Sequence, residues 1–163
     1  MATNPQLKKA HAVDEFTPEM IGELIRCKND PIYFIRNYVK VQHQTKGAVL
    51  FDLYSYQEDM INHFQNNTFS CVMASRQMGK TSVAAMYLLW YGTFHEDKLI
   101  LIASKNQNHA MEIAGRVRFA YENLPNWIKC GLKYYNRHMI EFDNGSRIVC
   151  EATTENKIGR AHV

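Results

Sequence analysis

The sequence predicts an α/β fold with a central, mainly parallel sheet flanked by helices and preceded by a helical N-terminal region. Short apolar runs at residues 69–74 and 99–103 are bounded by turn residues, as buried strands are. A helical pattern follows each run, over residues 79–91 and 110–124. Strands that alternate with helices in this way are typical of α/β sheets.

The composition is that of a globular protein: 46% of the 163 residues are hydrophobic and 21% are charged. It excludes disordered and collagen-like chains. The formal charge of +3 is too small to predict nucleic-acid binding by itself. The longest apolar run, residues 83–91, falls far short of the roughly 20 residues that span a bilayer, so no membrane is expected among the partners. Four scattered cysteines without a C-x-x-C pair predict free, buried, reduced thiols and an intracellular compartment.

The first third of the chain shows several helix-start signals. Residues 1–14 form a polar arm without periodicity, and Thr17-Pro18-Glu19 then opens a helix that runs to about Lys28. Asp30-Pro31 repeats the same signal. Residues 42–48 are expected to form a loop. Ser55 and Glu58 have the spacing of a capping box, which predicts a helix through about Gln65.

The end of the chain predicts a hairpin. Pro125 terminates the helix over residues 110–124. Alternating runs at residues 139–142 and 147–151 then flank Asp143-Asn144-Gly145, and Asn-Gly between such runs is a strong hairpin signal.

One loop carries a chemical motif, and it lies between the first predicted strand and the next helix. It consists of Ala74, Ser75, Arg76, Gln77, Met78, Gly79, Lys80 and Thr81. The last three residues end a phosphate-binding P-loop, although Ala74 stands where the pattern asks for glycine. Backbone N–H groups of such a loop and of the helix N-terminus bind anions. Lys80 would reach the β- and γ-phosphates, and the Thr81 hydroxyl would bind Mg²⁺.

Two neighbouring features each have two interpretations. Arg76, inside the loop, is either a finger on the γ-phosphate or a solvated arginine. Tyr56 and Gln57, before the P-loop, either contact adenine by stacking and amide pairing or are ordinary packed and surface residues.

These residues give the chain a resemblance to a known family. It resembles the N-terminal ATPase domain of the large terminase subunit of tailed phages, over roughly residues 30–157. The stretches that carry the likeness are DPIYFIRNYVKV from Asp30, LYSYQEDM from Leu53, SRQMGKT from Ser75, LLWYGTFHEDKLIL from Leu88 and IEFDNGS from Ile140.

The resemblance implies ATP and Mg²⁺ as cofactors and ATP-driven translocation of double-stranded DNA into a prohead. It implies adenine contacts for Tyr56 and Gln57, and catalytic roles for Lys80 and for Arg76 as a finger in cis. The implied partners are double-stranded DNA, the portal protein, the small terminase subunit and, for a full-length chain, further copies in a ring. The implied location is the cytoplasm of the infected bacterial host, at the capsid portal vertex.

The family also needs an apolar strand that ends in acidic residues, and none follows residue 81. The strand at 99–103 runs into Ser104-Lys105, and Asp143 lies in a turn. Residues 158–163 (IGRAHV) match the in-frame translation of a common sequencing adapter. We therefore expect an N-terminal arm and helix at 1–29, a C-terminally truncated ATPase domain at 30–157, an artefact at 158–163 and no nuclease domain.

Such a fragment should bind ATP but hydrolyse it poorly. The parent protein would be an ATPase and endonuclease. The alternatives are a fragment of a helicase-like P-loop motor and a non-catalytic ATP-binding regulator.

Overall fold

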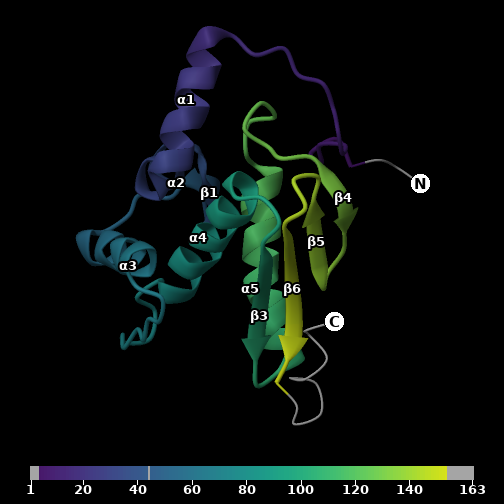
Figure 1. Ribbon diagram of the computed structural model, residues 1–163. Coiled ribbons are helices and arrows are strands. Elements are labelled where there is room, and N and C mark those ends of the chain that lie inside the picture. Colours follow the sequence, from purple (N-terminus) through teal and green to yellow (C-terminus); the bar gives the residue numbers. More distant parts are fainter. Residues whose placement is uncertain (1–3, 44, 154–163) are drawn as a thin grey trace.

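The computed structural model describes residues 4–43 and 45–153, which form a mixed α/β fold. Figure 1 shows a helical N-terminal region beside a four-stranded sheet. Within the described residues, none of the helices combines the length and hydropathy of a membrane span. The prediction of residues 158–163 as an artefact lies outside the described part of the chain.

The first two helices begin where the sequence predicts. In α1 (Pro18–Asn29), Thr17 Oγ1 accepts a hydrogen bond from the Met20 N–H at 3.3 Å. In α2 (Pro31–Tyr38), Asp30 Oδ1 accepts one from the Tyr33 N–H at 2.9 Å. Each side chain satisfies a donor that the helix itself leaves unpaired, and the proline that follows fits the first helical position.

The next segment departs from the prediction. Residues 42–48 are not simply a loop, because β1 (Lys40–His43) and β2 (Gly47–Leu50) pair as an antiparallel hairpin. Helix α3 (Ser55–Asn66) begins as expected, but the predicted Ser55–Glu58 capping box is wrong. Gln57 Oε1 accepts the Tyr54 N–H at 3.1 Å, and Glu58 instead forms an ion pair with Arg36 at 2.9 Å.

The main sheet corrects the prediction of a mainly parallel arrangement. Its order is β3 (Leu99–Ser104), β6 (Arg147–Ala152), β5 (Met139–Phe142) and β4 (Leu132–Tyr135). Only β3 and β6 are parallel, whereas β6–β5 and β5–β4 are antiparallel. The physical reason is the tight turn at Gly145 (φ 85°), which returns the chain directly beside β5.

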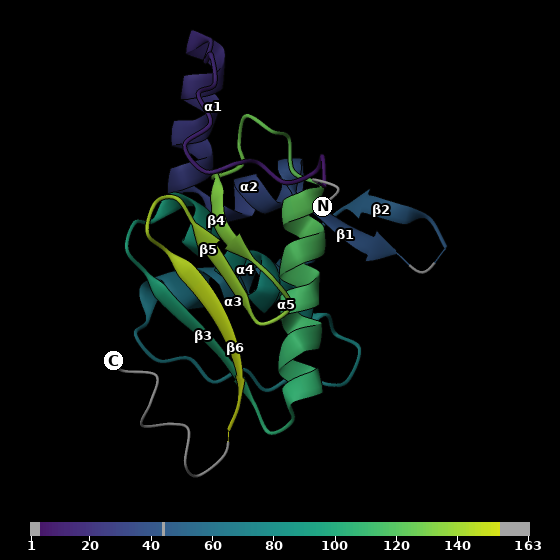
Figure 2. The ribbon, with the colours of Figure 1, turned by 90° about the vertical axis from the view of Figure 1, so that its right-hand side faces the viewer.

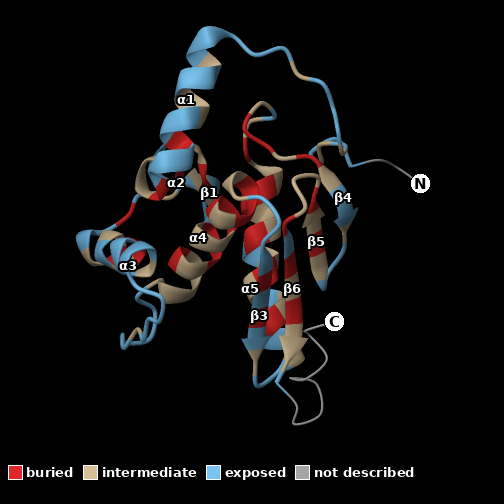
Figure 3. Ribbon diagram, viewed as in Figure 1, coloured by how far each residue is buried: buried red, intermediate tan, exposed pale blue. Residues whose placement is uncertain are grey.

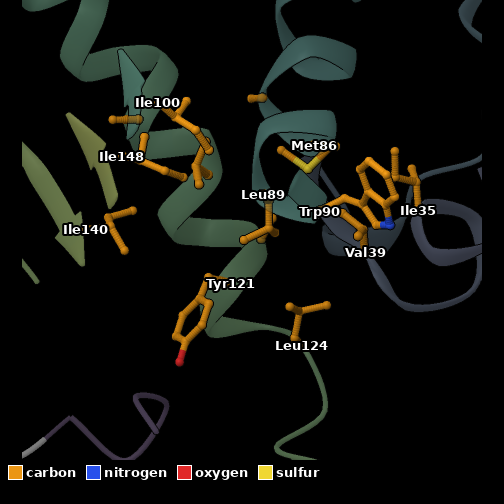
Figure 4. Packing of buried hydrophobic residues seen from close by; sticks show 14 of the residues in the cluster. Ile35, Val39, Met86, Leu89, Trp90, Ile100, Tyr121, Leu124, Ile140 and Ile148 are labelled. Atoms are coloured by element: carbon orange, nitrogen blue, oxygen red, sulfur yellow. The ribbon is translucent and has the colours of Figure 1, made fainter. Parts of the chain in front are cut away.

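The helices cover one face of this sheet. Helix α4 (Lys80–Phe94) packs on α5 (Gln107–Glu122), and α5 contacts β3 and β6 (Figure 2). Figure 4 shows Leu89 and Tyr121 beside the inward-facing isoleucines of the sheet. The buried side chains of the sheet are Ile100, Ile102, Ile140, Phe142, Ile148 and Cys150. The core therefore lies between the sheet and α4–α5 and continues between α4 and α2, where Phe34 and Ile35 are buried.

The opposite face of β3 is open. Burial alternates along this strand, and Leu99 and Leu101 are 48% and 46% exposed (Figure 3). The prediction of a buried strand at residues 69–74 is wrong. That segment forms no helix or strand and is unpaired within the described residues, and Phe69 and Met73 are more than nine-tenths exposed. A run of apolar residues becomes a strand only where a neighbour supplies hydrogen bonds, and β3, at the edge of the sheet, is not paired with it.

The other edge of the sheet is covered by the N-terminal arm. The Leu132 N–H donates to Lys8 O at 3.0 Å, and Lys9 forms an isolated parallel bridge with Leu132. The buried Lys129 ammonium donates to Gln6 O at 2.7 Å and to Glu122 O at 3.0 Å. The arm thus lies beside β4.

The four cysteines are free, as predicted, but their burial is uneven. Cys27 and Cys150 are buried, Cys130 is half-buried, and Cys71 is exposed on the unpaired segment. Burial raises the pKa of the Cys27 thiol to about 12 and that of Cys150 to about 11. These two thiols are therefore protonated and unreactive near neutral pH.

Candidate nucleotide-binding site

The loop before α4 has the backbone of an anion-binding site. Gln77 and Gly79 both adopt left-handed conformations, with φ of 66° and 72°. Gly79 is the N-cap residue of α4, and no side chain caps this helix end. The first backbone N–H groups of α4 therefore remain available to a ligand. Residues 74–78 are exposed, so the site is accessible.

Lys80 turns back toward the loop that precedes it. Its ammonium donates to the carbonyl oxygens of Ala74, at 3.3 Å, and of Ser75, at 3.2 Å. The cation is thereby held inside the loop, where it can meet a phosphate. Thr81 lies half-buried in the first turn of α4. The structure thus brings together Ala74, Ser75, Gly79, Lys80 and Thr81.

Arg76 stands apart from this group. Its side chain is exposed and forms no hydrogen bond or ion pair with any other described residue. Both interpretations of Arg76 therefore remain compatible with its position. An arginine that is not held by the protein can reach toward a bound phosphate or stay in solvent.

Gln57 and Tyr56 contact the loop before α4. The Met78 carbonyl accepts hydrogen bonds from Gln57 Nε2 at 3.2 Å and from the Tyr56 hydroxyl at 3.1 Å. Gln57 is only 3% exposed, and its Oε1 accepts the Tyr54 N–H. The start of α3 is therefore fastened to the loop through a single carbonyl. We call this contact the Gln57–Met78 clamp.

Gly79 is required by both space and backbone conformation. A Cβ atom at this position would lie 2.7 Å from Gln57 Nε2. A φ of 72° also disfavours any residue that carries a Cβ atom. The Gln57–Met78 clamp and Gly79 therefore fix the conformation of the loop together.

Sequence reasoning missed one contact at this site. The guanidinium of Arg116, on α5, donates through Nη1 to Ser82 Oγ at 2.6 Å. Ser82 follows Thr81 in the first turn of α4, so α5 is attached to the helix that begins at the loop. No local pattern could reveal this contact, because it joins residues 34 apart in the chain.

Carboxylates are scarce around the loop in the described part of the chain. Apart from Glu151, no aspartate or glutamate in the described ranges forms a hydrogen bond or ion pair with residues 74–81. No cluster of three metal-ligating side chains occurs there either. The Thr81 hydroxyl is thus a candidate ligand of the kind that suits a cation held mainly by phosphates and water.

The fold and the loop define an α/β protein with a candidate phosphate site at a helix N-terminus. A family model described as terminase large subunit, T4likevirus-type, N-terminal, matches residues 71–163, more than half of the chain. The chain therefore belongs to the T4-like terminase large subunits, and the match is to their N-terminal domain. This confirms the predicted family.

Proposed function

We propose that this chain is the ATP-binding part of a viral packaging motor, in which residues 74–81 bind the phosphates of ATP. The observation that carries the proposal is the Gly79 N-cap of α4, with Lys80 folded into the loop before it. The uncapped N–H groups and the ammonium supply hydrogen bonds and positive charge at one point. The Thr81 hydroxyl supplies one ligand to Mg²⁺.

Tyr56 and Gln57 would bind the adenine base. The Gln57 amide uses one lone pair of Oε1 for Tyr54, and Nε2 donates toward Met78 and Tyr56. A second lone pair of Oε1 remains, and a base that displaced the 3.4 Å contact with the Tyr56 hydroxyl would free one N–H. These two groups would then pair with the N6 and N7 edge of adenine. Because the same amide holds Met78, base recognition would be linked to the shape of the phosphate loop.

Hydrolysis of ATP needs more than these binding groups. Attack of water on the γ-phosphate requires a residue that orients or activates it, and apart from Glu151 no described carboxylate forms a hydrogen bond or ion pair with residues 74–81. Arg76 would stabilise charge on the γ-phosphate as a finger in cis. We infer that the chain binds ATP and hydrolyses it slowly. Binding without turnover would also fit a regulatory ATP-binding protein.

In the intact packaging machine, ATP turnover would drive double-stranded DNA into a prohead. The partners would be the DNA, the portal protein, the small terminase subunit and further copies in a ring. The machine would act at the capsid portal vertex, in the cytoplasm of the infected bacterial host. Membership of the terminase family supports this proposal over a helicase-like motor.

A titration with a fluorescent ATP analogue tests the site. Lys80→Ala removes a charge-assisted contact, so nucleotide affinity should fall roughly tenfold to hundredfold. Gln57→Ala should weaken ATP about fivefold and narrow the preference for ATP over GTP. Gln65→Ala, an exposed change at the other end of α3, is the matched control and should leave affinity unchanged. Equal affinity for the Lys80→Ala variant and the wild type would overturn the assignment.

A further inference from the structure

The turn between β4 and β5 is held by several hydrogen bonds and carries basic residues. It comprises residues 134–138, and we call it the basic turn. Asn136 Oδ1 accepts the backbone N–H groups of His138 and Met139, both at 2.7 Å. The backbone N–H of Asn136 closes the turn on Met139 O at 2.9 Å. These bonds fix the backbone of the hairpin end.

Two neighbouring elements fasten the turn further. The Arg118 guanidinium, on α5, donates through Nη1 to Arg137 O at 2.8 Å and Asn136 O at 3.2 Å. The Cys150 N–H, on β6, donates to His138 O at 2.8 Å, and Gln107 lies 3.2 Å from His138 Nδ1. The backbone of an exposed turn is thus anchored to a helix and to a strand.

The exposed cations at and beside the turn take no part in that anchoring. Arg137 is exposed, and its guanidinium forms no hydrogen bond or ion pair with any other described residue. Lys133, on the adjoining strand, is likewise exposed and unpaired within the described ranges. Tyr134 is 48% exposed, and its hydroxyl accepts from Asn136 Nδ2. Two cations and an aromatic hydroxyl therefore face solvent from a fixed backbone, with Arg118 beneath them.

We propose that the basic turn contacts the phosphate backbone of double-stranded DNA. Guanidinium and ammonium groups and a tyrosine hydroxyl are the usual donors to phosphate oxygens. A rigid scaffold lowers the entropy that binding costs. The inference rests on the proposed function, which supplies DNA as the translocated polymer. Arg118 is 19 residues from Arg137 in the chain, so its support of the turn cannot be read from the local sequence.

Helix α5 lies between the basic turn and the nucleotide site. Arg118 holds the turn, and Arg116, two residues earlier, holds Ser82 in the first turn of α4. Figure 2 shows α5 running beside the strands that carry the turn. A contact with DNA at the turn would therefore act on α5, which Arg116 attaches to α4.

Fluorescence anisotropy with a labelled 30-base-pair duplex tests this surface on the full 163-residue chain. Arg137→Ala should weaken DNA binding about fivefold to tenfold in low salt, and it should lower the salt dependence by about one phosphate contact. Arg137→Lys should restore most of the affinity, and Arg137→Glu should lose more than Arg137→Ala. Lys28→Ala, which removes an exposed charge from α1, is the matched control and should change affinity less than twofold.

The nucleotide site and the DNA surface can be tested separately. Lys80→Ala should lose nucleotide and keep DNA affinity, whereas Arg137→Ala should do the reverse. Equal losses for Arg137→Ala and Lys28→Ala would overturn the proposal, because binding would then follow net charge alone. A wild-type chain that binds nucleotide but not duplex DNA would overturn it too, and would leave the basic turn to an acidic protein partner.

Discussion

The two edges of the main sheet differ in how they are covered. At β4, the N-terminal arm supplies a backbone hydrogen bond to Leu132, and the buried Lys129 fastens the arm to the end of α5. At β3, no described strand pairs with the outer edge, and Leu99 and Leu101 are half exposed. Strand edges with free hydrogen-bonding groups are sites where another chain or segment can add.

The candidate nucleotide site lies on the less covered side. The unpaired segment at residues 69–74 leads into the loop, so its exposed apolar side chains lie next in sequence to the candidate phosphate-binding residues. The loop keeps its shape through the Gln57–Met78 clamp rather than through a strand. Local hydrogen bonds can thus hold the shape of a candidate binding loop while the neighbouring sheet has an unpaired edge within the described residues.

The largest predicted effect compares the two faces of β3. Ile102 is 5% exposed and packs in the core, whereas its neighbour Leu101 is 46% exposed. Ile102→Ala should lower the free energy of unfolding by about 3 kcal/mol. Leu101→Ala should cost less than about 1 kcal/mol, as surface changes do. Urea unfolding of both variants checks this. Equal losses would mean that the open face is covered in solution, for instance by a second copy of the chain.

A smaller effect is expected at the loop. Gly79→Ala puts a Cβ atom 2.7 Å from Gln57 Nε2 at a φ of 72°, so either the loop or the clamp must move. Nucleotide affinity should fall roughly tenfold, since left-handed strain costs about 1–2 kcal/mol. Gly22→Ala is the matched control, because nothing lies within 4 Å of a Cβ atom there. It should keep nucleotide affinity and slightly stabilise α1. Unchanged affinity in the Gly79→Ala variant would show that the left-handed loop is not needed for binding.

The sequence predicted the helices better than the sheet. Thr17 and Asp30 cap their own helices, so their positions are set by bonds over three residues. The hairpin around Asn144-Gly145 is local for the same reason. The strand at residues 69–74 failed because pairing depends on a neighbour that no local pattern specifies. The β1–β2 hairpin was missed because its strands are only four residues each and largely exposed.

The same contrast between local patterns and contacts of distant residues applies to the candidate nucleotide site. The Gly-Lys-Thr run placed Gly79, Lys80 and Thr81 at a helix N-terminus, where the structure has them. The sequence associates the Tyr56-Gln57 pair with adenine. It does not predict the hydrogen bonds that both side chains donate to the Met78 carbonyl. No sequence pattern indicated the contacts of Arg116 and Arg118. Their partners Ser82, Asn136 and Arg137 are distant in the chain.

The smallest predicted effect lies at the covered edge and depends on pH. Burial acts to raise the pKa of Asp143, but hydrogen bonds from Cys130 Sγ at 2.9 Å and from the His11 N–H at 3.0 Å outweigh it and hold the pKa below its ordinary value. A carboxyl whose pKa is lower in the folded protein stabilises the fold above its unfolded pKa. That stability is lost as the pH falls through the folded pKa.

Asp143→Asn replaces one accepting oxygen with a donor, so the contact with either Cys130 or His11 is lost. The free energy of unfolding at pH 7 should fall by about 1 kcal/mol. The difference in the free energy of unfolding between the variant and the wild type should shrink below pH 4, because protonation of the wild-type carboxyl removes its contribution to stability. Urea unfolding between pH 3 and pH 7 measures it, with the exposed Asp52→Asn as the matched control. A loss that stays constant over this range would show that the arm at β4 is held without the charge of Asp143, and the two edges would then differ in packing alone.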